Sequence, residues 1–351
     1  MFTILMYLSS GLFLGWSLGA NNAANFWGTA VGTRMVKFRT AAILCSILVI
    51  VGAVVSGAGA SMTIGKLGAI NSLGGAFTVA LATAVISSIM TRAGIPISTS
   101  QAVIGGIIGW NIFTGSPTDY TILGKIAMTW ITSPLLTAII AFLMFYLVKV
   151  VLDNSKWHML KIDAWTRFLL IVVGAFGSYS LGANNIGNVM GIFVSASPFS
   201  DINVMGIFDL SSIQQLFLLG GIAIAVGVIT YSKRVMSTVS INIYKLSPVT
   251  ALIVVFAVSI TMFLFASVSF KTFLTSHGLP SFPLVPVSSS QAIVGAVIGV
   301  SLAKGGKNLQ VRMLMKVALG WVVTPVATAI LALVLLYITQ NVFLMEVFSK
   351  G

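Results

Sequence analysis

Two short stretches of the sequence place several amide side chains at close spacing within apolar segments. Residues 19–28 read GANNAANFWG, and residues 182–191 read GANNIGNVMG. The amides are Asn21, Asn22 and Asn25 in the first stretch and Asn184, Asn185 and Asn188 in the second. Spacings of three and four residues place Asn25 on the same helical face as Asn21 or Asn22. Because an unpaired amide is costly in an apolar environment, these side chains either hydrogen-bond to neighbouring helices or bind a ligand. Amides both donate and accept, so the ligand is an oxyanion or a cation.

A second pair of motifs has the residue types of a helix that starts inside an apolar region. PISTSQAVIGGIIG at 96–109 and PVSSSQAIVGAVIG at 286–299 each place a proline ahead of three hydroxyl residues. The proline breaks what precedes it, the hydroxyls supply the N-cap, and the helix resumes at Gln101 or Gln291. Such a start exposes backbone N–H groups at the positive end of the helix dipole, which suits an oxyanion, although the hydroxyls could also serve only as caps. The hydroxyl residues are Ser98, Thr99, Ser100, Ser288, Ser289 and Ser290.

The apolar segments contain no acidic residue, which limits the chemistry available there. The acidic residues are Asp119, Asp153, Asp163, Asp201, Asp209 and Glu346, all in loops, at segment edges or in the tail. An anionic substrate would therefore meet no fixed negative charge, whereas a coupling cation would find no carboxylate. The segments also lack a His or Cys beside a nucleophile and a metal-ligand cluster, so we expect no catalytic residue, no metal and no enzyme activity. The single cysteine, Cys45, is interpreted as a packing residue.

The composition is that of an integral membrane protein. Of 351 residues, 58% are hydrophobic and 7% charged, the mean hydropathy is +1.06, and soluble domains carry roughly 25% charged residues. The long apolar segments are near the roughly 20 residues that a helix needs to cross the hydrocarbon, which excludes closed strands. They are 3–31, 40–62, 76–91, 122–148, 166–192, 211–230, 249–270 and 315–338. The first is expected to stay in the mature protein, because no basic residue precedes it and it is longer than a signal-peptide core.

The uneven distribution of Lys and Arg explains the formal charge of +13. Basic residues gather just after the first span and near 149–167, 233–245 and 304–316. By the positive-inside rule these segments are cytoplasmic, which places both termini outside. The outward loops are then 63–75, 113–121, 194–210 and 271–285. This pattern needs no nucleic-acid partner and predicts a multi-pass protein of the cell (plasma) membrane, surrounded by membrane lipid.

Three blocks of sequence recur in the same order, which predicts an internal duplication. Besides the amide and serine blocks, KIAMTWITSPLLTAI answers KVALGWVVTPVATAI, so that Pro134 matches Pro325. The charge pattern gives the first half an odd number of membrane passages, so the second half enters from the opposite side and the repeat is inverted. An inverted repeat relates the two halves by a two-fold axis. If the two serine-capped helix starts meet at this axis, they line one cavity, which favours ligand binding over a purely capping role for the serines. We expect repeats at 1–148 and 166–351, a cytoplasmic connecting loop at 149–165, and either re-entrant hairpins or double crossings at 76–112 and 249–303.

Four stretches together resemble the inorganic phosphate transporter (PiT) family of phosphate/sulfate permeases: GANNAANFWGTAVGTR, PISTSQAVIGG, GVITYSKRVMSTVSINIYKLSP and PVSSSQAIVGA. The resemblance covers nearly the whole chain and recurs in both halves. It implies an all-α polytopic homodimer with inverted-topology repeats, broken helices and paired re-entrant hairpins, which moves inorganic phosphate by alternating access. The transport is then symport with Na+ or H+ and needs no other cofactor. The resemblance implies phosphate ligands at Ser98, Thr99, Ser100, Ser288, Ser289 and Ser290, with Asn25 and Asn188 from the broken helices. The remaining candidates for the coupling ion or substrate are Asn21, Asn22, Asn184, Asn185, Gln101 and Gln291.

Two departures from the family pattern bear on the coupling ion and the substrate. The family motif Gly-Ala-Asn-Asp-x-x-Asn has an Asp, associated with sodium and substrate, where this chain has Asn22 and Asn185; Gln101 and Gln291 stand where many members have His. Without a carboxylate, no group takes a proton from protonated phosphate. The alternative is therefore a permease for sulfate, which stays ionised, or for another tetrahedral oxyanion, coupled to protons rather than sodium. An anion channel is a further alternative, less consistent with two buried helix starts. Arg92 is either a membrane anchor or an anion contact.

Overall fold

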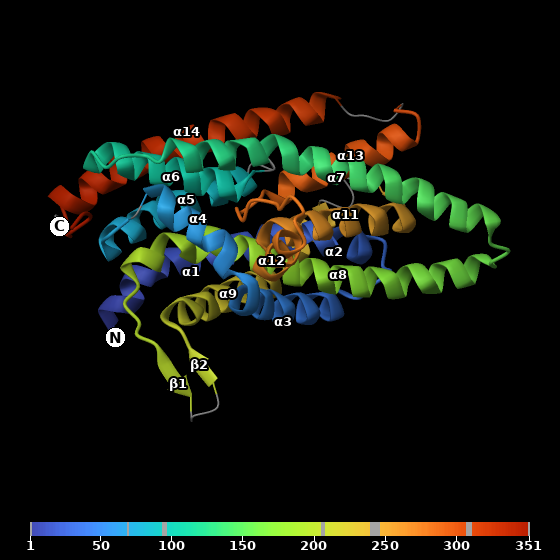
Figure 1. Ribbon diagram of the computed structural model, residues 1–351, viewed down its shortest axis with the longest axis horizontal. Helices are drawn as coiled ribbons and strands as arrows, with labels where there is room; N and C mark the ends of the chain where they lie inside the picture. Colours follow the sequence, from blue (N-terminus) through green and yellow to red (C-terminus); the bar gives the residue numbers. More distant parts are fainter. Residues whose placement is uncertain are drawn as a thin grey trace.

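The computed structural model describes residues 2–68, 70–92, 97–204, 208–238, 246–306 and 311–349, and it consists almost entirely of helices (Figure 1). The first half contains α1 (Phe2–Asn22), α2 (Ala24–Gly32), α3 (Phe38–Ser56), α4 (Ala58–Gly68), α5 (Leu73–Arg92), α6 (Thr99–Thr114) and α7 (Tyr120–Asn154). The second half contains α8 (Met159–Met190), the 3-10 helix η1 (Gly191–Ala196), α9 (Ser212–Thr230), α10 (Ser232–Thr238), α11 (Pro248–Ala266), α12 (Val268–Ser276), α13 (Ser289–Ala303) and α14 (Val311–Asn341).

Seven helical segments in the described part of the chain are long and apolar enough to span a membrane. They are Thr3–Gly32, which combines α1 and α2, together with α3, α5, α7, α9, α11 and Val317–Asn341 of α14. The protein is therefore a multi-pass membrane protein, as the composition predicts. Of the eight segments expected from the sequence, 166–192 is not among these seven. It lies in α8 and η1; α8 has 32 residues, which is long enough to cross a membrane, and carries the second amide stretch in its last third.

The connection between the two halves is shorter than expected. Residues 149–165 are helical except for 155–158, because α7 continues to Asn154 and His158 caps the start of α8, its Nδ1 accepting from the Leu160 N–H at 3.3 Å. With 35 residues at about 1.5 Å each, α7 is longer than the hydrocarbon thickness of roughly 30 Å and reaches beyond it at one end or both. The expected loop is thus reduced to residues 155–158 between two long helices.

A short β-hairpin also departs from the expectation of a purely α-helical fold. β1 (Ile202–Val204) pairs antiparallel with β2 (Phe208–Leu210) inside the expected outer loop 194–210. Asn203 Nδ2 donates to Asp209 Oδ1 at 2.7 Å across the pair. A two-stranded hairpin has open edges and therefore needs water, which a loop outside the hydrocarbon provides.

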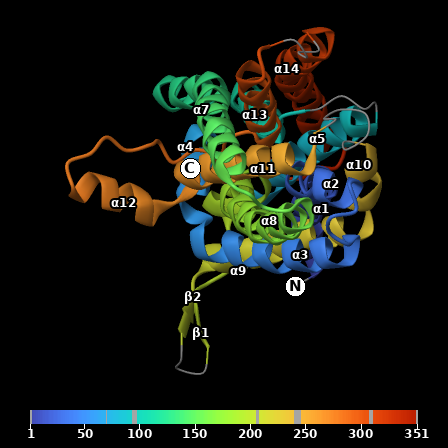
Figure 2. The same ribbon diagram turned by 90° about the vertical axis from the view of Figure 1, so that its right-hand side faces the viewer.

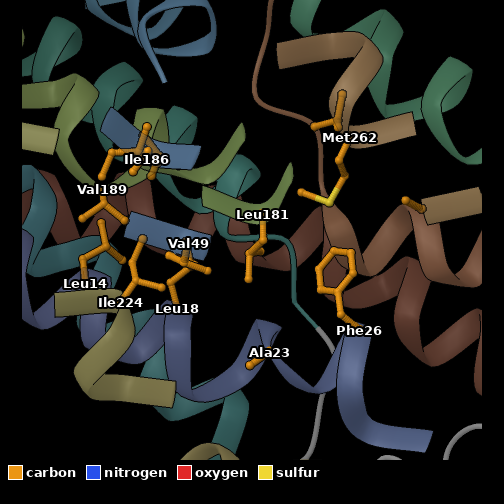
Figure 3. Close-up of a cluster of buried hydrophobic side chains, with 14 of the residues drawn as sticks. Leu14, Leu18, Ala23, Phe26, Val49, Leu181, Ile186, Val189, Ile224 and Met262 are labelled. Atoms are coloured by element: carbon orange, nitrogen blue, oxygen red, sulfur yellow. The ribbon is translucent and has the colours of Figure 1, made fainter. Parts of the chain in front are cut away.

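A central bundle is formed by α1, α3, α8 and α9, which pack against one another. Small residues let their backbones approach closely: a Cβ at Gly19 of α1 would meet the carbonyl oxygen of Ile224, and a Cβ at Gly182 of α8 would meet that of Val49. Figure 3 shows part of the buried apolar core of this bundle. It includes Leu14 and Leu18 of α1, Val49 of α3, Ile224 of α9, and Leu181, Ile186 and Val189 of α8.

Two groups of helices flank the central bundle, and each combines elements from both halves of the sequence. In one group α14 packs on α5 and α6; in the other α7 packs on α11 and α13. A Cβ at Gly105 of α6 would meet the carbonyl oxygen of Pro325 in α14, and a Cβ at Gly295 of α13 would meet that of Pro134 in α7. The last long helix of each half is thus exchanged into the group formed by the other half.

The helices that follow the serine motifs begin near the middle of the molecule. α6 and α13 lead away from there in opposite directions along the long axis (Figure 1). The start of α1 and the end of the chain lie at one end of this axis, and the junction of α7 and α8 lies at the other; β1 and β2 project away from the axis in the half that holds the termini. The view along the axis shows α12 projecting sideways from the bundle (Figure 2), and none of its residues is buried.

The two amide stretches interrupt their helices differently. α1 ends at Asn22 and α2 begins at Ala24, although Ala23 keeps a helical backbone with φ −56° and ψ −30°. α8 continues through Asn188 to Met190, and only there does the chain change to the 3-10 helix η1. The resemblance implies broken helices at the two amide stretches. The structure shows only a slight irregularity at Ala23 and a change to a 3-10 helix after Met190.

Candidate functional site

Both serine motifs form helix starts with the same cap. Ser98 Oγ accepts a hydrogen bond from the Gln101 N–H at 3.3 Å, and Ser288 Oγ accepts one from the Gln291 N–H at 3.3 Å. The expected hydroxyl caps are confirmed, with the helix beginning at the second hydroxyl residue rather than at the glutamine. Of the two prolines expected to break the preceding structure, Pro286 is described and Pro96 lies outside the described residues.

The two helix starts lie against each other, and a hydroxyl from each binds the segment ahead of the other. Ser290 Oγ donates to the carbonyl oxygen of Ile97 at 2.6 Å, and Ser100 Oγ donates to that of Val287 at 3.5 Å. The two contacts correspond, because Ser290 and Val287 occupy the positions of Ser100 and Ile97 in the matching motif. The positive ends of two helix dipoles therefore meet in one buried place.

Amides from both stretches reach this place. Asn25 Nδ2 donates to Ser289 Oγ at 3.1 Å, and Asn188 Nδ2 donates to Ser100 Oγ at 2.9 Å. Asn188 Nδ2 also donates to Asn185 Oδ1 at 3.1 Å. The bonds of Asn25 and Asn188 to the hydroxyls each join one half of the sequence to the other, so the site exists only where the two halves meet.

Asn184 occupies a different position from these amides. Its Oδ1 accepts from the Val287 N–H at 3.0 Å, and its Nδ2 donates to the carbonyl oxygen of Met262 in α11 at 3.5 Å. Both bonds hold the backbone, so Asn184 positions the start of α13. At the end of α1, Asn21 Nδ2 donates to Asn22 Oδ1 at 3.4 Å. In the described part of the chain, no hydrogen bond brings these last two amides to the serine motifs.

Most residues of the site are buried, and several of their polar atoms lack partners. All eight residues of the two Ser/Thr-Gln clusters are at most 7% exposed, whereas Asn25 is half-buried. Among the described residues, the buried atoms without a hydrogen-bond partner here are Gln101 Oε1, Gln291 Oε1, Asn185 Nδ2 and Asn188 Oδ1. An unpaired buried polar atom costs about 1–3 kcal/mol. These four atoms belong to residues of the serine and amide motifs, and each could pair with a polar ligand.

The contacts described above involve no charged side chain. Arg92, which the sequence offers as an anion contact or an anchor, is exposed at the last residue of α5. Within the described ranges, no group of three or more His, Cys, Asp or Glu could hold a metal ion. Any attraction for an anion here would come from hydroxyl and amide donors and from helix dipoles rather than from a cation.

Sequence reasoning did not find the partners that lock the two helix starts together. The acceptors are the carbonyl oxygens of Ile97 and Val287, and a backbone acceptor leaves no trace in the side-chain pattern. Nor did it separate the positioning role of Asn184 from the other amides. The available signal was that each motif places a β-branched residue directly before its capping serine.

A multi-pass helical bundle with a buried polar site, formed midway by two opposed helix starts, is the architecture of a membrane transporter. The chain belongs to the phosphate transporter family, whose family model matches residues 18–332 and 271–349. It is thus a member of a transporter family and not an enzyme, as its sequence predicts.

Relatives and a solved structure agree with this assignment. The chain is 28% identical to a protein of Methanocaldococcus jannaschii named a putative phosphate permease, with 95% of this chain and 97% of the relative covered. It is 25% identical to a protein of the same name from Pyrococcus furiosus, with 94% of each covered. A structure described as the sodium-dependent phosphate transporter has the same fold, with a TM-score of 0.76, 22% identity, and coverage of 97% of this chain and 99% of that one. These comparisons do not favour the sulfate alternative.

Proposed function

We propose that the protein moves inorganic phosphate across the cell membrane as an ion-coupled symporter that works by alternating access. Membership of the phosphate transporter family supports the substrate. The observation that carries the proposal is the meeting of two helix starts whose hydroxyls bind across the halves. Hydroxyls, amide N–H groups and free backbone N–H groups are the donors that a tetrahedral oxyanion needs. The proposed ligands are Ser98, Thr99, Ser100, Ser288, Ser289, Ser290, Asn25 and Asn188, with Gln101, Gln291 and Asn185 beside them.

The repeats at 1–148 and 166–351 are proposed to be inverted copies, with re-entrant hairpins at 76–112 and 249–303. Matching contacts support this: Gly105 lies against Pro325 as Gly295 lies against Pro134. The opposite directions of α6 and α13 support the inversion (Figure 1). A two-fold relation of this kind would place the phosphate on the axis, equally close to both helix starts.

The moving parts in this proposal are the two flanking groups rather than the two halves of the sequence. Because α14 packs with α5 and α6, and α7 packs with α11 and α13, each group would move as a mixed unit against the central bundle. The bonds from Asn25 to Ser289 and from Asn188 to Ser100 would open during this movement. A bound phosphate would accept from the same N–H groups and so replace the hydroxyl acceptors.

Sodium is the coupling ion of this proposal. The proposed ligands are Ser, Thr, Asn and Gln, none of which exchanges a proton near neutral pH, so a proton could travel only on phosphate itself. Amide and backbone carbonyl oxygens are hard ligands that suit a small cation. The structural relative is described as sodium-dependent. Asn22 and Asn185 would then serve with their carbonyl oxygens where the family has carboxylates.

The orientation and assembly follow from charge and from the resemblance. The junction of α7 and α8, in a region rich in Lys and Arg, lies opposite the end that holds both chain termini (Figure 1). By the positive-inside rule, we propose that the termini lie outside the cell. A homodimer is proposed from the resemblance alone, and cross-linking in native membranes would test it.

The test is uptake by proteoliposomes of labelled phosphate, with labelled sulfate in parallel, under a sodium gradient or a proton gradient. We expect saturable phosphate uptake driven by sodium, and counterflow stimulated by phosphate on the far side. Uptake that does not saturate and shows no counterflow would indicate a channel. Sulfate uptake without phosphate uptake would refute the proposed substrate.

A further inference from the structure

Among the helices that the structure describes, three begin with the pattern Ser-x-x-Gln, and one of these three completes it. At the start of α9, the Gln214 N–H donates to Ser211 Oγ at 3.2 Å and the Ser211 N–H donates back to Gln214 Oε1 at 3.0 Å, a full capping box. At α6 and α13 the first bond is present, whereas Gln101 Oε1 and Gln291 Oε1 have no partner. The glutamine side-chain oxygen of this motif is therefore hydrogen-bonded at the start of α9 and lacks a partner at the two helix starts of the candidate site.

The two unpartnered glutamine oxygens are buried where the helix starts meet. Gln101 is 3% exposed and Gln291 is 1% exposed. A side chain in the first turn of a helix leans toward the N-terminus, so both glutamines lean toward the starts of their own helices. Buried acceptors without partners are rare in folded proteins and call for an explanation. What these two oxygens lack is a hydrogen-bond donor.

We propose that Gln101 Oε1 and Gln291 Oε1 accept hydrogen bonds from the hydroxyl of a protonated phosphate and thereby make the site prefer phosphate to sulfate. Near neutral pH phosphate keeps at least one proton, and sulfate keeps none. The serines, amides and backbone N–H groups donate to either anion, whereas only phosphate can donate in return. This rests on the proposed function, because it concerns selection at the same site.

The preference follows from an asymmetry in hydrogen bonding. A site that binds a hydroxyl rejects an analogue without one, because its own polar group is then buried unpaired. With sulfate, each glutamine oxygen would face another acceptor in a place that excludes water. A neutral amide oxygen thus supplies the discrimination against a fully ionised anion that would otherwise need a carboxylate.

A competing partner for each oxygen lies on the neighbouring helix. Gly109 lies against Ala329 one turn after Gly105 lies against Pro325, and Gly299 lies against Ala138 one turn after Gly295 lies against Pro134. α6 therefore runs in the same direction as α14, and α13 in the same direction as α7. This register sets Trp321 level with Gln101 and Trp130 level with Gln291. The Nε1 atoms of both indoles are buried without a partner. A structural bond between glutamine and tryptophan would affect the binding of both anions alike, which separates it from the proposed role.

The test replaces both glutamines by methionine, Gln101→Met with Gln291→Met, which keeps side-chain length and removes the acceptor. Gln214→Met is the matched control, because it removes the same side chain from the same motif at α9. Phosphate uptake by proteoliposomes is measured with sulfate or arsenate as competitor. We expect the half-saturation concentration for phosphate to rise about tenfold or more in the double variant, as expected for lost buried hydrogen bonds. Arsenate, which also keeps a proton, weakens with phosphate. Sulfate competes at least as well as before, because the acceptors that rejected it are gone, and Gln214→Met keeps the wild-type ratio.

Other outcomes overturn the inference in distinguishable ways. An unchanged phosphate-to-sulfate ratio in an active double variant rejects the glutamines as the selective groups and leaves the proposed function intact. An equal loss for both anions assigns the glutamines to structure, including a bond to Trp130 or Trp321. Wild-type protein that takes up no phosphate refutes the proposed function itself. Should the double variant not fold, each single variant still tests the idea, since one oxygen remains and part of the shift in ratio is expected.

Discussion

A single methyl group added where the exchanged helices touch should force them apart. A Cβ on Gly105 would lie 2.7 Å from both the carbonyl carbon and the Cα of Pro325, and a Cβ on Gly295 would lie 2.8 Å from the same atoms of Pro134. These are backbone atoms, which cannot rotate away. The carbonyl oxygen of Pro325 lies closer still, so restoring an ordinary contact of 3.4 Å requires α6 and α14 to separate by more than 3.4 minus 2.7, or at least roughly 0.7 Å.

The energetic consequence can be set against a control on an exposed helix face. Overpacking costs about 1–3 kcal/mol, of which alanine in a helix recovers about 1 kcal/mol relative to glycine. We expect Gly105→Ala or Gly295→Ala to lose up to about 2 kcal/mol. Gly124→Ala in α7, where a Cβ meets nothing within 4 Å, should instead gain up to about 1 kcal/mol.

The assay is thermal unfolding of the purified protein in detergent, combined with phosphate uptake by the same variants. The expected order of unfolding temperature is Gly124→Ala highest, then wild type, then the two contact variants. The contact variants should also bind phosphate more weakly, because the helix starts move with their helices. Equal stability of Gly105→Ala, Gly295→Ala and Gly124→Ala would refute the close exchange of helices on which the proposed moving groups depend.

Three further predictions concern the site itself. Replacing Ser98 and Ser288 together by alanine removes both N-caps, at about 1 kcal/mol each, and should raise the half-saturation concentration for phosphate strongly while expression is retained; unchanged uptake would remove these serines from the site. Asn184→Leu leaves the buried Val287 N–H unpaired, which costs about 1–3 kcal/mol, so unfolding temperature should fall further than for Asn185→Leu, and equal values would contradict its positioning role. Replacing Asn22 and Asn185 together by Asp should lower the sodium concentration needed for uptake, and a sodium dependence identical to wild type would argue against a cation site there.

Much of the site was predictable because its polar residues are conspicuous in an apolar sequence. Ser98 and Ser288 were expected as N-caps, and both are, since a serine after a proline has few other roles in an apolar region. Asn25 and Asn188 were expected near the serines, and each donates to one of them. The repeat itself predicted that the two motifs would be equivalent, which their matching caps reflect.

What the sequence did not reveal depends on contacts between distant segments. α7 and α14 are exchanged between the flanking groups through the close contacts of Gly105 with Pro325 and of Gly295 with Pro134. A glycine in an apolar helix does not indicate which helix it will contact. The different fates of Asn184 and Asn185, which are adjacent in sequence, depend on which face of α8 meets the segment at Val287. The tight turn at 155–158 was missed because charged residues suggest a loop, whereas they also continue a helix into water.

The described residues of the site include no carboxylate that could take a proton from phosphate. Recognising the hydroxyl of a protonated phosphate nevertheless requires only a hydrogen-bond acceptor and not a base. Gln101 Oε1 and Gln291 Oε1 are buried acceptors without partners, one on each helix start. An amide oxygen accepts the hydrogen bond and leaves the proton on phosphate, so substrate selection needs no titratable side chain. If these oxygens select phosphate, the pH dependence of uptake should follow the protonation of the anion and should be unaffected by Gln214→Met.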